Sequence, residues 1–145
     1  MAAEFGFITA QTLQPNASAV LEDVRPCRRR PQLVMHDNMT PNINLRGVNG
    51  RSGNAQYNVR FSGNISVATG GTVGEIDLAL SIDGYVLPLT VAAATPAAIG
   101  DRFHVSGDAN IEVPSCCCKT VTVVNASTDT AITVENLGVE VSRIA

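Results

Sequence analysis

The stretch from Gln56 to Val67, QYNVRFSGNISV, decides the fold class of this chain. Every second residue is apolar or glycine and every residue between is polar, the first set being Tyr57, Val59, Phe61, Gly63, Ile65 and Val67. Successive side chains of a strand point to opposite sides, so a period of two predicts one face on a core and one in polar surroundings. That pattern is typical of an antiparallel sheet.

A second strand with the same alternation follows the turn sequence TGGT, in which Gly70 and Gly71 permit positive backbone angles. Its apolar residues are Ile76, Leu78, Leu80 and Ile82, and they alternate with Glu75, Asp77, Ala79 and Ser81. Asp83-Gly84 comes directly afterwards and precedes the apolar segment 85–89. This arrangement predicts a tight β-hairpin.

The rest of the chain also favours strands, at 102–106, 109–113, 120–125 and 131–141, with short strands in the N-terminal part around Phe5 to Leu13, Leu33 to Met35 and Ile43 to Leu45. A change of parity at Asn136-Leu137-Gly138 predicts a bulge. Pro96 disfavours a helix in TVAAATPAAIG, residues 90–100, so we expect a connection across one end of the sheets. Eight to ten short strands broken by Gly, Pro and Asn predict an all-β, antiparallel jelly-roll β-sandwich.

Length and composition set the limits of that prediction. A chain of 145 residues has the size of one domain, so we expect a single domain over 1–145. With 45% apolar residues it can fill a core, which excludes wholesale disorder. No apolar run reaches the length of a membrane span, and the start MAAEFGFITA lacks the basic residues of a secretory signal. We therefore expect a soluble, unprocessed chain that does not contact membranes.

The net charge of −3 hides an asymmetry between the two parts of the chain. Residues 1–60 hold seven Arg and four acidic residues, whereas 61–145 hold three basic and nine acidic residues. A nucleic-acid partner is not expected, because such domains are usually basic. The dense basic cluster Arg28, Arg29 and Arg30 lies between two prolines, and we predict that it contacts carboxylates of a partner subunit. An ordinary solvated loop is the alternative.

Cysteine spacing gives no metal signature. The four cysteines are Cys27 and the consecutive Cys116, Cys117 and Cys118, which do not form the two spaced pairs of a zinc site. We expect reduced thiols that are buried or lie in an interface, and a structural disulfide or metal site is the alternative. The acidic residues Asp101, Asp108 and Asp129 fall in three separate predicted turns, so they do not predict a calcium site. No cofactor is expected.

Catalysis is not expected either. His36 and Asp37 are neighbours on a strand and would face opposite ways, so they cannot easily form the hydrogen bond of a catalytic triad. The second histidine, His104, lies between Phe103 and Val105 in a predicted strand. Glu75 and Asp77 would share an exposed sheet face rather than flank a cleft as glycosidase carboxylates do. The sequence therefore predicts a protein that is not an enzyme.

Three longer stretches carry a resemblance to a known family. They are FSGNISVATGGTVGEIDLALSIDGYVLPLT, ATPAAIGDRFHVSGDANIEVPSCCCKTVTVVNAS and AITVENLGVEVSRIA. Together with the N-terminal part they resemble the bacterial and bacteriophage branch of tumour-necrosis-factor-like jelly-roll domains, over about residues 4–145. The resemblance implies a ten-stranded sandwich that associates as a homotrimer. Such domains occur in phage virion proteins and at the tips of surface filaments.

The resemblance also implies a role. Relatives often carry a collagen-like stalk of Gly-X-Y repeats, which this sequence lacks. We therefore expect a trimeric structural protein of a bacteriophage virion, assembled in the bacterial cytoplasm, that decorates the capsid or caps a fibre and contacts other virion proteins. We expect the trimer to form around apolar residues of an outer sheet face. The alternative is a recognition head of a phage fibre or bacterial filament that binds a host-surface glycan or protein.

Overall fold

The computed structural model describes residues 2–25, 34–36, 38–47, 55–115 and 118–144. These residues form twelve strands and one short 3₁₀-helix, η1. The bounds are β1 Ala2–Phe7, β2 Gln11–Leu13, β3 Glu22–Arg25, β4 Val34–His36, β5 Ile43–Arg46, β6 Ala55–Val67, β7 Ile76–Ile82, β8 Tyr85–Val86, η1 Pro88–Thr90, β9 Ala92–Ala94, β10 Phe103–Val113, β11 Cys118–Asn125 and β12 Ile132–Arg143. The count exceeds the expected eight to ten because several strands have only two or three residues.

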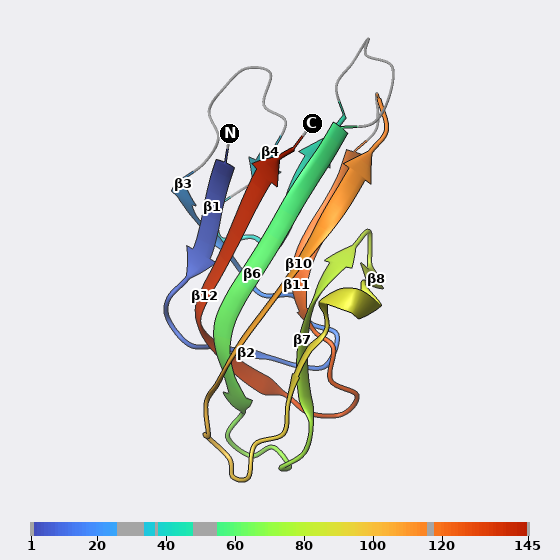
Figure 1. Ribbon diagram of the computed structural model, residues 1–145. Coiled ribbons are helices and arrows are strands. Elements are labelled where there is room, and N and C mark those ends of the chain that lie inside the picture. The colour runs from blue at the N-terminus through green and yellow to red at the C-terminus, as the bar shows by residue number, and fades with distance from the viewer. Residues whose placement is uncertain (1, 26–33, 37, 48–54, 116–117, 145) are drawn as a thin grey trace.

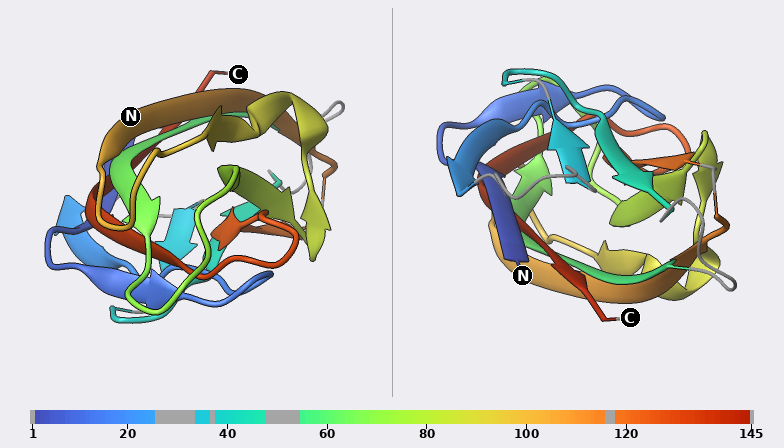
Figure 2. Two further views of the ribbon diagram at one scale, coloured as in Figure 1. Left: turned by 90° about the horizontal axis from the view of Figure 1, so that it is seen from below. Right: turned by 90° about the horizontal axis from the view of Figure 1, so that it is seen from above.

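The strands form two antiparallel sheets that face one another (Figures 1 and 2). The front sheet, nearest the viewer in Figure 1, has the order β10-β6-β12-β1-β3, with β2 also paired to β12. The back sheet has the order β4-β5-β11-β7-β8, with β9 also paired to β7. The pairing of Ala2 with Ser142 brings both chain ends to the same end of the sandwich (Figure 1). The predicted all-β jelly-roll sandwich is confirmed.

The deciding stretch forms β6, the long strand between β10 and β12. Its alternation holds over most of its length: Tyr57, Val59 and Ile65 are fully buried, while Arg60 is exposed. The Tyr57 hydroxyl donates a hydrogen bond to the main-chain oxygen of Arg46 in the back sheet. One side of β6 thus supplies the core, and the other forms the solvent-facing side of the front sheet.

The second predicted strand is β7, and its predicted core residues Ile76, Leu78 and Leu80 have no exposed surface. The Asp83-Gly84 hairpin is confirmed, with φ of 50° and 89° at the two turn residues. One expectation is wrong: the outward-facing Ala79 and Ser81 are buried too. Neighbouring side chains cover small residues such as these from solvent, and Ser81 lies between Thr122 of β11 and Val86 of β8.

Two strands expected at 102–106 and 109–113 are one continuous strand, β10. Gly107 is in its middle and makes no turn. A Cβ atom there would lie 2.7 Å from the Phe61 ring and 2.9 Å from the Thr90 carbonyl oxygen. Glycine at this position therefore permits η1 and the Phe61 ring to approach β10 closely.

The segment 90–100 is more ordered than a simple connection. It contains no α-helix, as Pro96 predicts, but Ala92–Ala94 pairs with β7 as strand β9.

The bulge predicted in the last strand is confirmed, because the register of β12 against β6 shifts between Glu135 and Gly138. Asn136 in that bulge has a φ of 51° and its amide donates to the Ile8 carbonyl.

Candidate interaction surfaces

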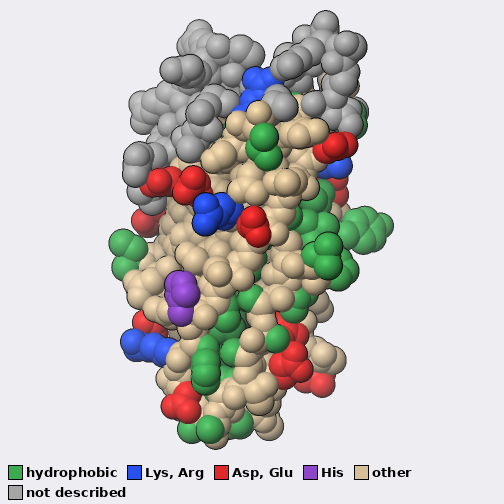
Figure 3. Space-filling view, viewed as in Figure 1, with side chains coloured by type: hydrophobic (Ala, Val, Ile, Leu, Met, Phe, Trp, Pro, Cys, Tyr) green, Lys and Arg blue, Asp and Glu red, His purple; other side chains and the backbone are tan. Residues whose placement is uncertain are grey.

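The solvent-facing side of the front sheet, called the front face below, carries a row of charged side chains. Glu4, Glu140, Arg60 and Asp108 are successive cross-strand partners on β1, β12, β6 and β10. We call them the charged row. Asp108 therefore lies within a strand and not in a turn as expected. Figure 3 shows acidic and basic side chains close together on this face. Within the row, Arg60 lies between Glu140 and Asp108, and Glu4 lies beyond Glu140.

The next row across the same four strands contains only the smallest side chains. Gly6, Gly138, Ser62 and Ser106 are again successive cross-strand partners, and we call them the small row. A trough of about 730 Å³ lies over this row, with the charged row in its wall. A Cβ atom added at Gly138 would have Ser62 Oγ as its nearest neighbour, at 4.0 Å. The floor of the trough is thus open to a side chain from outside.

Exposed apolar side chains gather at the edge of the back sheet, on β8 and η1. Leu89 is 99% exposed and Tyr85 79% exposed, and Val86 and Val91 lie beside them in sequence with more than a third of their surface exposed. Green side chains along the right-hand side of Figure 3 mark this region. We call these four residues the apolar edge. The solvent-facing residues of β6 are polar instead, so the expectation of an apolar outer sheet face is wrong for this strand.

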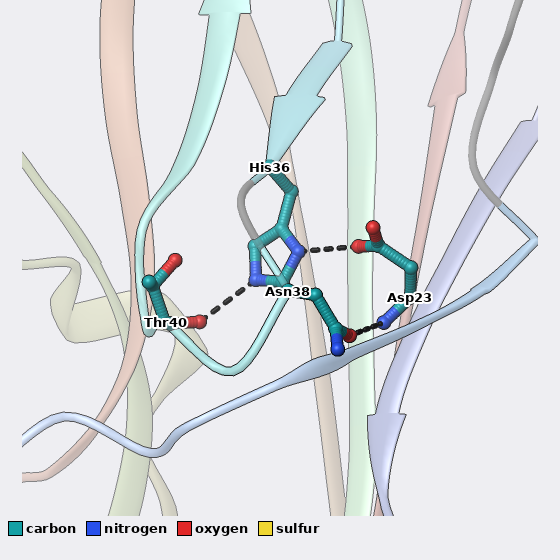
Figure 4. Close-up of polar contacts among 4 residues, drawn as sticks. All are labelled: Asp23, His36, Asn38 and Thr40. Atoms are coloured by element: carbon teal, nitrogen blue, oxygen red, sulfur yellow. Dashed lines mark hydrogen bonds and ion pairs between the residues drawn. The ribbon is translucent and has the colours of Figure 1, made fainter.

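His36 belongs to a polar cluster that joins the two sheets (Figure 4). Its Nδ1 lies 2.5 Å from Oδ1 of Asp23 in β3, and its Nε2 lies 2.7 Å from the carbonyl oxygen of Thr40. Asn38 Oδ1 accepts a hydrogen bond from the Asp23 amide, and the Phe5 ring lies 4.7 Å from the imidazole. The His36 side chain is only 1% exposed. Since both ring nitrogens are engaged and buried, this cluster holds the fold together and offers no base to a substrate.

The remaining catalytic candidates are placed apart. His104 is exposed on β10, and its Nδ1 lies 3.1 Å from Asn64 Oδ1 of the neighbouring strand. Burial raises the pKa of the Asp77 carboxyl, and the charge and hydrogen bond of Glu75 raise it further. Asp77 Oδ1 is buried, and among the described residues it has no hydrogen-bond partner. The carboxyls of Glu75 and Asp77 thus interact with each other and do not flank a cleft.

Several predicted residues lie outside the described residues: Asp37, Cys27, Cys116, Cys117, and the arginines Arg28, Arg29 and Arg30. Cys118 is a free, exposed thiol at the start of β11, so it is not buried within the chain, and the expected interface position stays a prediction. Over the part of the chain that the structure describes, no group of His, Cys, Asp and Glu side chains is arranged to hold a metal ion. The same part contains no helix long and apolar enough to cross a membrane.

Sequence reasoning did not find the small row or the partner of His36. Gly6, Ser62, Ser106 and Gly138 are spread over the whole chain, and only the strand registers bring them into one line. Asp23 is 13 residues from His36, on a strand of the other sheet. Neither relationship has a signal in local spacing.

No protein-family profile matches this sequence, and no curated protein matches it. Solved structures do match in fold. The structure of Eiger TNF from S. frugiperda aligns with a TM-score of 0.71 at 11% identity, over 100% of this chain and 92% of that one. The globular domain of zebrafish complement 1qA aligns with a TM-score of 0.61 at 11% identity, over 99% and 97%.

Murine APRIL, in the crystal structure at pH 5.0, aligns with a TM-score of 0.61 at 7% identity, over 99% of this chain and all of that one. Sequence identities this low show a shared fold and nothing further. The chain therefore has the jelly-roll sandwich fold of TNF and C1q domains.

Proposed function

We propose that this chain is a non-enzymatic, homotrimeric structural module of a bacteriophage virion, which decorates the capsid or caps a fibre. The fold shared with TNF and C1q domains supports a binding or assembly role. The engagement of both His36 ring nitrogens and the exposed position of His104 support the absence of catalysis. The virion setting rests on the resemblance of the sequence to the phage branch of this fold.

The observation that carries the trimer is the presence of two different surfaces on one chain, one that projects large side chains and one that is hollowed. The apolar edge projects large side chains, above all Leu89 and Tyr85. The trough over the small row offers about 730 Å³ on another face. A contact between two different patches is heterologous, and repeated by rotation it closes into a ring. Seating the edge of one copy in the trough of the next would remove exposed apolar surface from water.

Two substitutions test this arrangement without disturbing the core. Leu89→Asp places a charge on the apolar edge, and Gly138→Leu fills the trough from a position where a side chain has free space. Both variants are expected to fold, by circular dichroism, and to lose the trimer in light scattering. Val73→Asp is the matched control, since Val73 is 44% exposed in the β6–β7 connection, away from both surfaces. Trimers that persist in both variants would contradict this arrangement.

The virion setting is tested on purified particles of the source phage by quantitative mass spectrometry. A capsid decoration is expected at tens to hundreds of copies per particle. A few trimers per particle would favour the second candidate, a recognition head that binds a host-surface glycan or protein. Particles that lack the chain altogether would contradict both. The second candidate is favoured by a polar depression in the back sheet, described next.

A further inference from the structure

The solvent-facing side of the back sheet carries a depression of about 400 Å³ at the point where β7 and β11 run side by side. Its polar lining comes from four separate parts of the chain. The residues are Asn16 and Ser18 before β3, Asn42 before β5, Ser81 on β7 with Asp83 directly after it, and Thr120 and Thr122 on β11. Val86 and Val124 add apolar wall. The depression is on the opposite sheet from the trough, and Val86 is the lining residue that also belongs to the apolar edge.

The floor of the depression contains two hydroxyl groups. Ser81 and Thr122 are directly opposite each other on neighbouring strands, 3% and 9% exposed. Among the described residues, the buried side-chain polar atom that lacks a hydrogen-bond partner is Asp77 Oδ1, so neither hydroxyl is a sealed, unsatisfied group, and both line the depression. Each hydroxyl can donate one hydrogen bond and accept two, so the floor can serve both kinds of ligand group.

The rim adds further donors and acceptors. The side-chain amides of Asn16 and Asn42 and the Ser18 hydroxyl belong to the lining, and a side-chain amide offers two donors and an acceptor. Asp83 Oδ1 accepts a hydrogen bond of 2.9 Å from the Thr120 main-chain amide, which fixes the carboxylate at the hairpin turn. The site thus combines a fixed acceptor with several groups of either kind.

The charge of the lining restricts the class of ligand. It contains one carboxylate and no basic side chain. Phosphate, sulfate and carboxylate ligands require Arg, Lys or converging amide groups, and the carboxylate would repel them. A neutral ligand rich in hydroxyl groups matches the mixed donors and acceptors, and its C–H surface matches Val86 and Val124. The volume is at the lower end for small-molecule pockets, which fits a single ring better than a long chain.

We propose that this depression binds one neutral sugar unit, such as the terminal hexose or N-acetylhexosamine of a surface glycan. The inference deepens the recognition role named above as the second candidate and rests on it. Hydrolysis is not part of it, since a glycosidase needs two carboxyl groups across the scissile bond and the lining supplies one. The site is a binding site only.

The test begins with a glycan array that carries neutral hexose- and N-acetylhexosamine-terminated glycans next to sialylated and sulfated ones. Saturable binding to neutral termini is expected. The free monosaccharide of the best neutral terminus is then titrated calorimetrically, and amide shifts in the ¹⁵N spectrum are expected at residues 81–84 and 120–124. Binding to none of the glycans, or only to the anionic ones, would overturn the proposal.

Matched variants locate the site. Thr122→Val keeps the shape of the side chain and removes the hydroxyl, and we expect roughly three- to tenfold weaker binding, with a larger loss in the double variant Ser81→Ala, Thr122→Val. Thr133→Val is the control, because Thr133 is a half-buried strand residue on the front face. Equal affinity of the double variant and the control would place the sugar elsewhere and overturn the proposal. Measuring the mass of each sample separates loss of sugar binding from loss of the trimer.

Discussion

The carboxylate of Asp23 and the imidazole of His36 tie the front sheet to the back sheet, with 2.5 Å between Oδ1 and Nδ1 (Figure 4). The opposite ring nitrogen lies 2.7 Å from the Thr40 carbonyl oxygen, which can only accept a hydrogen bond. Nε2 therefore donates this hydrogen bond, and the other ring nitrogen contacts the carboxylate on the opposite sheet.

The two contacts of the imidazole predict that replacing His36 destabilises the fold. A hydrogen bond to a charged group contributes about 1.5–3 kcal/mol, so we expect a loss of that order in His36→Leu, which has no group to hydrogen-bond with Asp23 or Thr40.

Urea denaturation at a fixed protein concentration measures it. The free energy of unfolding of His36→Leu is expected to be lower than that of wild type by this amount. Equal free energies of unfolding in both proteins would show that the Asp23–His36 contact contributes nothing to stability.

The Asp77 carboxyl predicts that the stability of the fold depends on pH. Its carboxyl has a raised pKa, chiefly from burial and secondly from Glu75. A raised pKa in the folded state means stability that is present at low pH, where the group is protonated, and is lost as pH rises through the folded pKa. Asp77→Asn removes the ionisation and lets an amide donate to Glu75. We expect a higher thermal midpoint than wild type at pH 7 and no gain at pH 3, measured by calorimetry.

The core prediction concerns Leu78, which is fully buried in β7. Leu78→Ala removes buried surface and leaves a cavity, and such changes cost about 2–5 kcal/mol. Chemical denaturation should show a lower midpoint. Val73→Ala, at an exposed apolar position, is the control and should change stability by less than about 0.5 kcal/mol. A wild-type midpoint for Leu78→Ala would remove this face of β7 from the core.

Local patterns were sufficient for the framework of the fold. The alternation of β6, the positive φ angles of Asp83 and Gly84, and the bulge at Asn136 all follow from the side chains of the segment itself. Such features depend on a period of two or on turn chemistry, which short sequences carry.

Features set by tertiary contact were not predictable. Gly107 resembles a strand break in sequence, but it is glycine because Phe61 and Thr90 approach β10. Ala92–Ala94 has no alternation and becomes a strand only because an edge of β7 is free to pair. The small row needs three strand registers at once, and the Asp23–His36 contact needs two strands of different sheets. These depend on how distant segments meet.

The arginine cluster Arg28, Arg29 and Arg30 remains a prediction. If it contacts carboxylates of a virion partner, changing all three residues to Gln should weaken attachment to the parent particle and leave the domain folded, because guanidinium–carboxylate pairs are lost. Particle occupancy measured over a salt series tests it, since such contacts weaken with ionic strength. Equal occupancy of variant and wild type at every salt concentration would indicate an ordinary exposed loop.

Native mass spectrometry of the purified chain at micromolar concentration tests the homotrimer most directly. Seating the apolar edge in the trough of the next copy predicts a folded species at three times the 15.2 kDa mass of one chain. It also predicts a thermal midpoint that rises with protein concentration, because folding and assembly are linked. A folded species at 15.2 kDa, with a midpoint independent of concentration, would contradict the trimer.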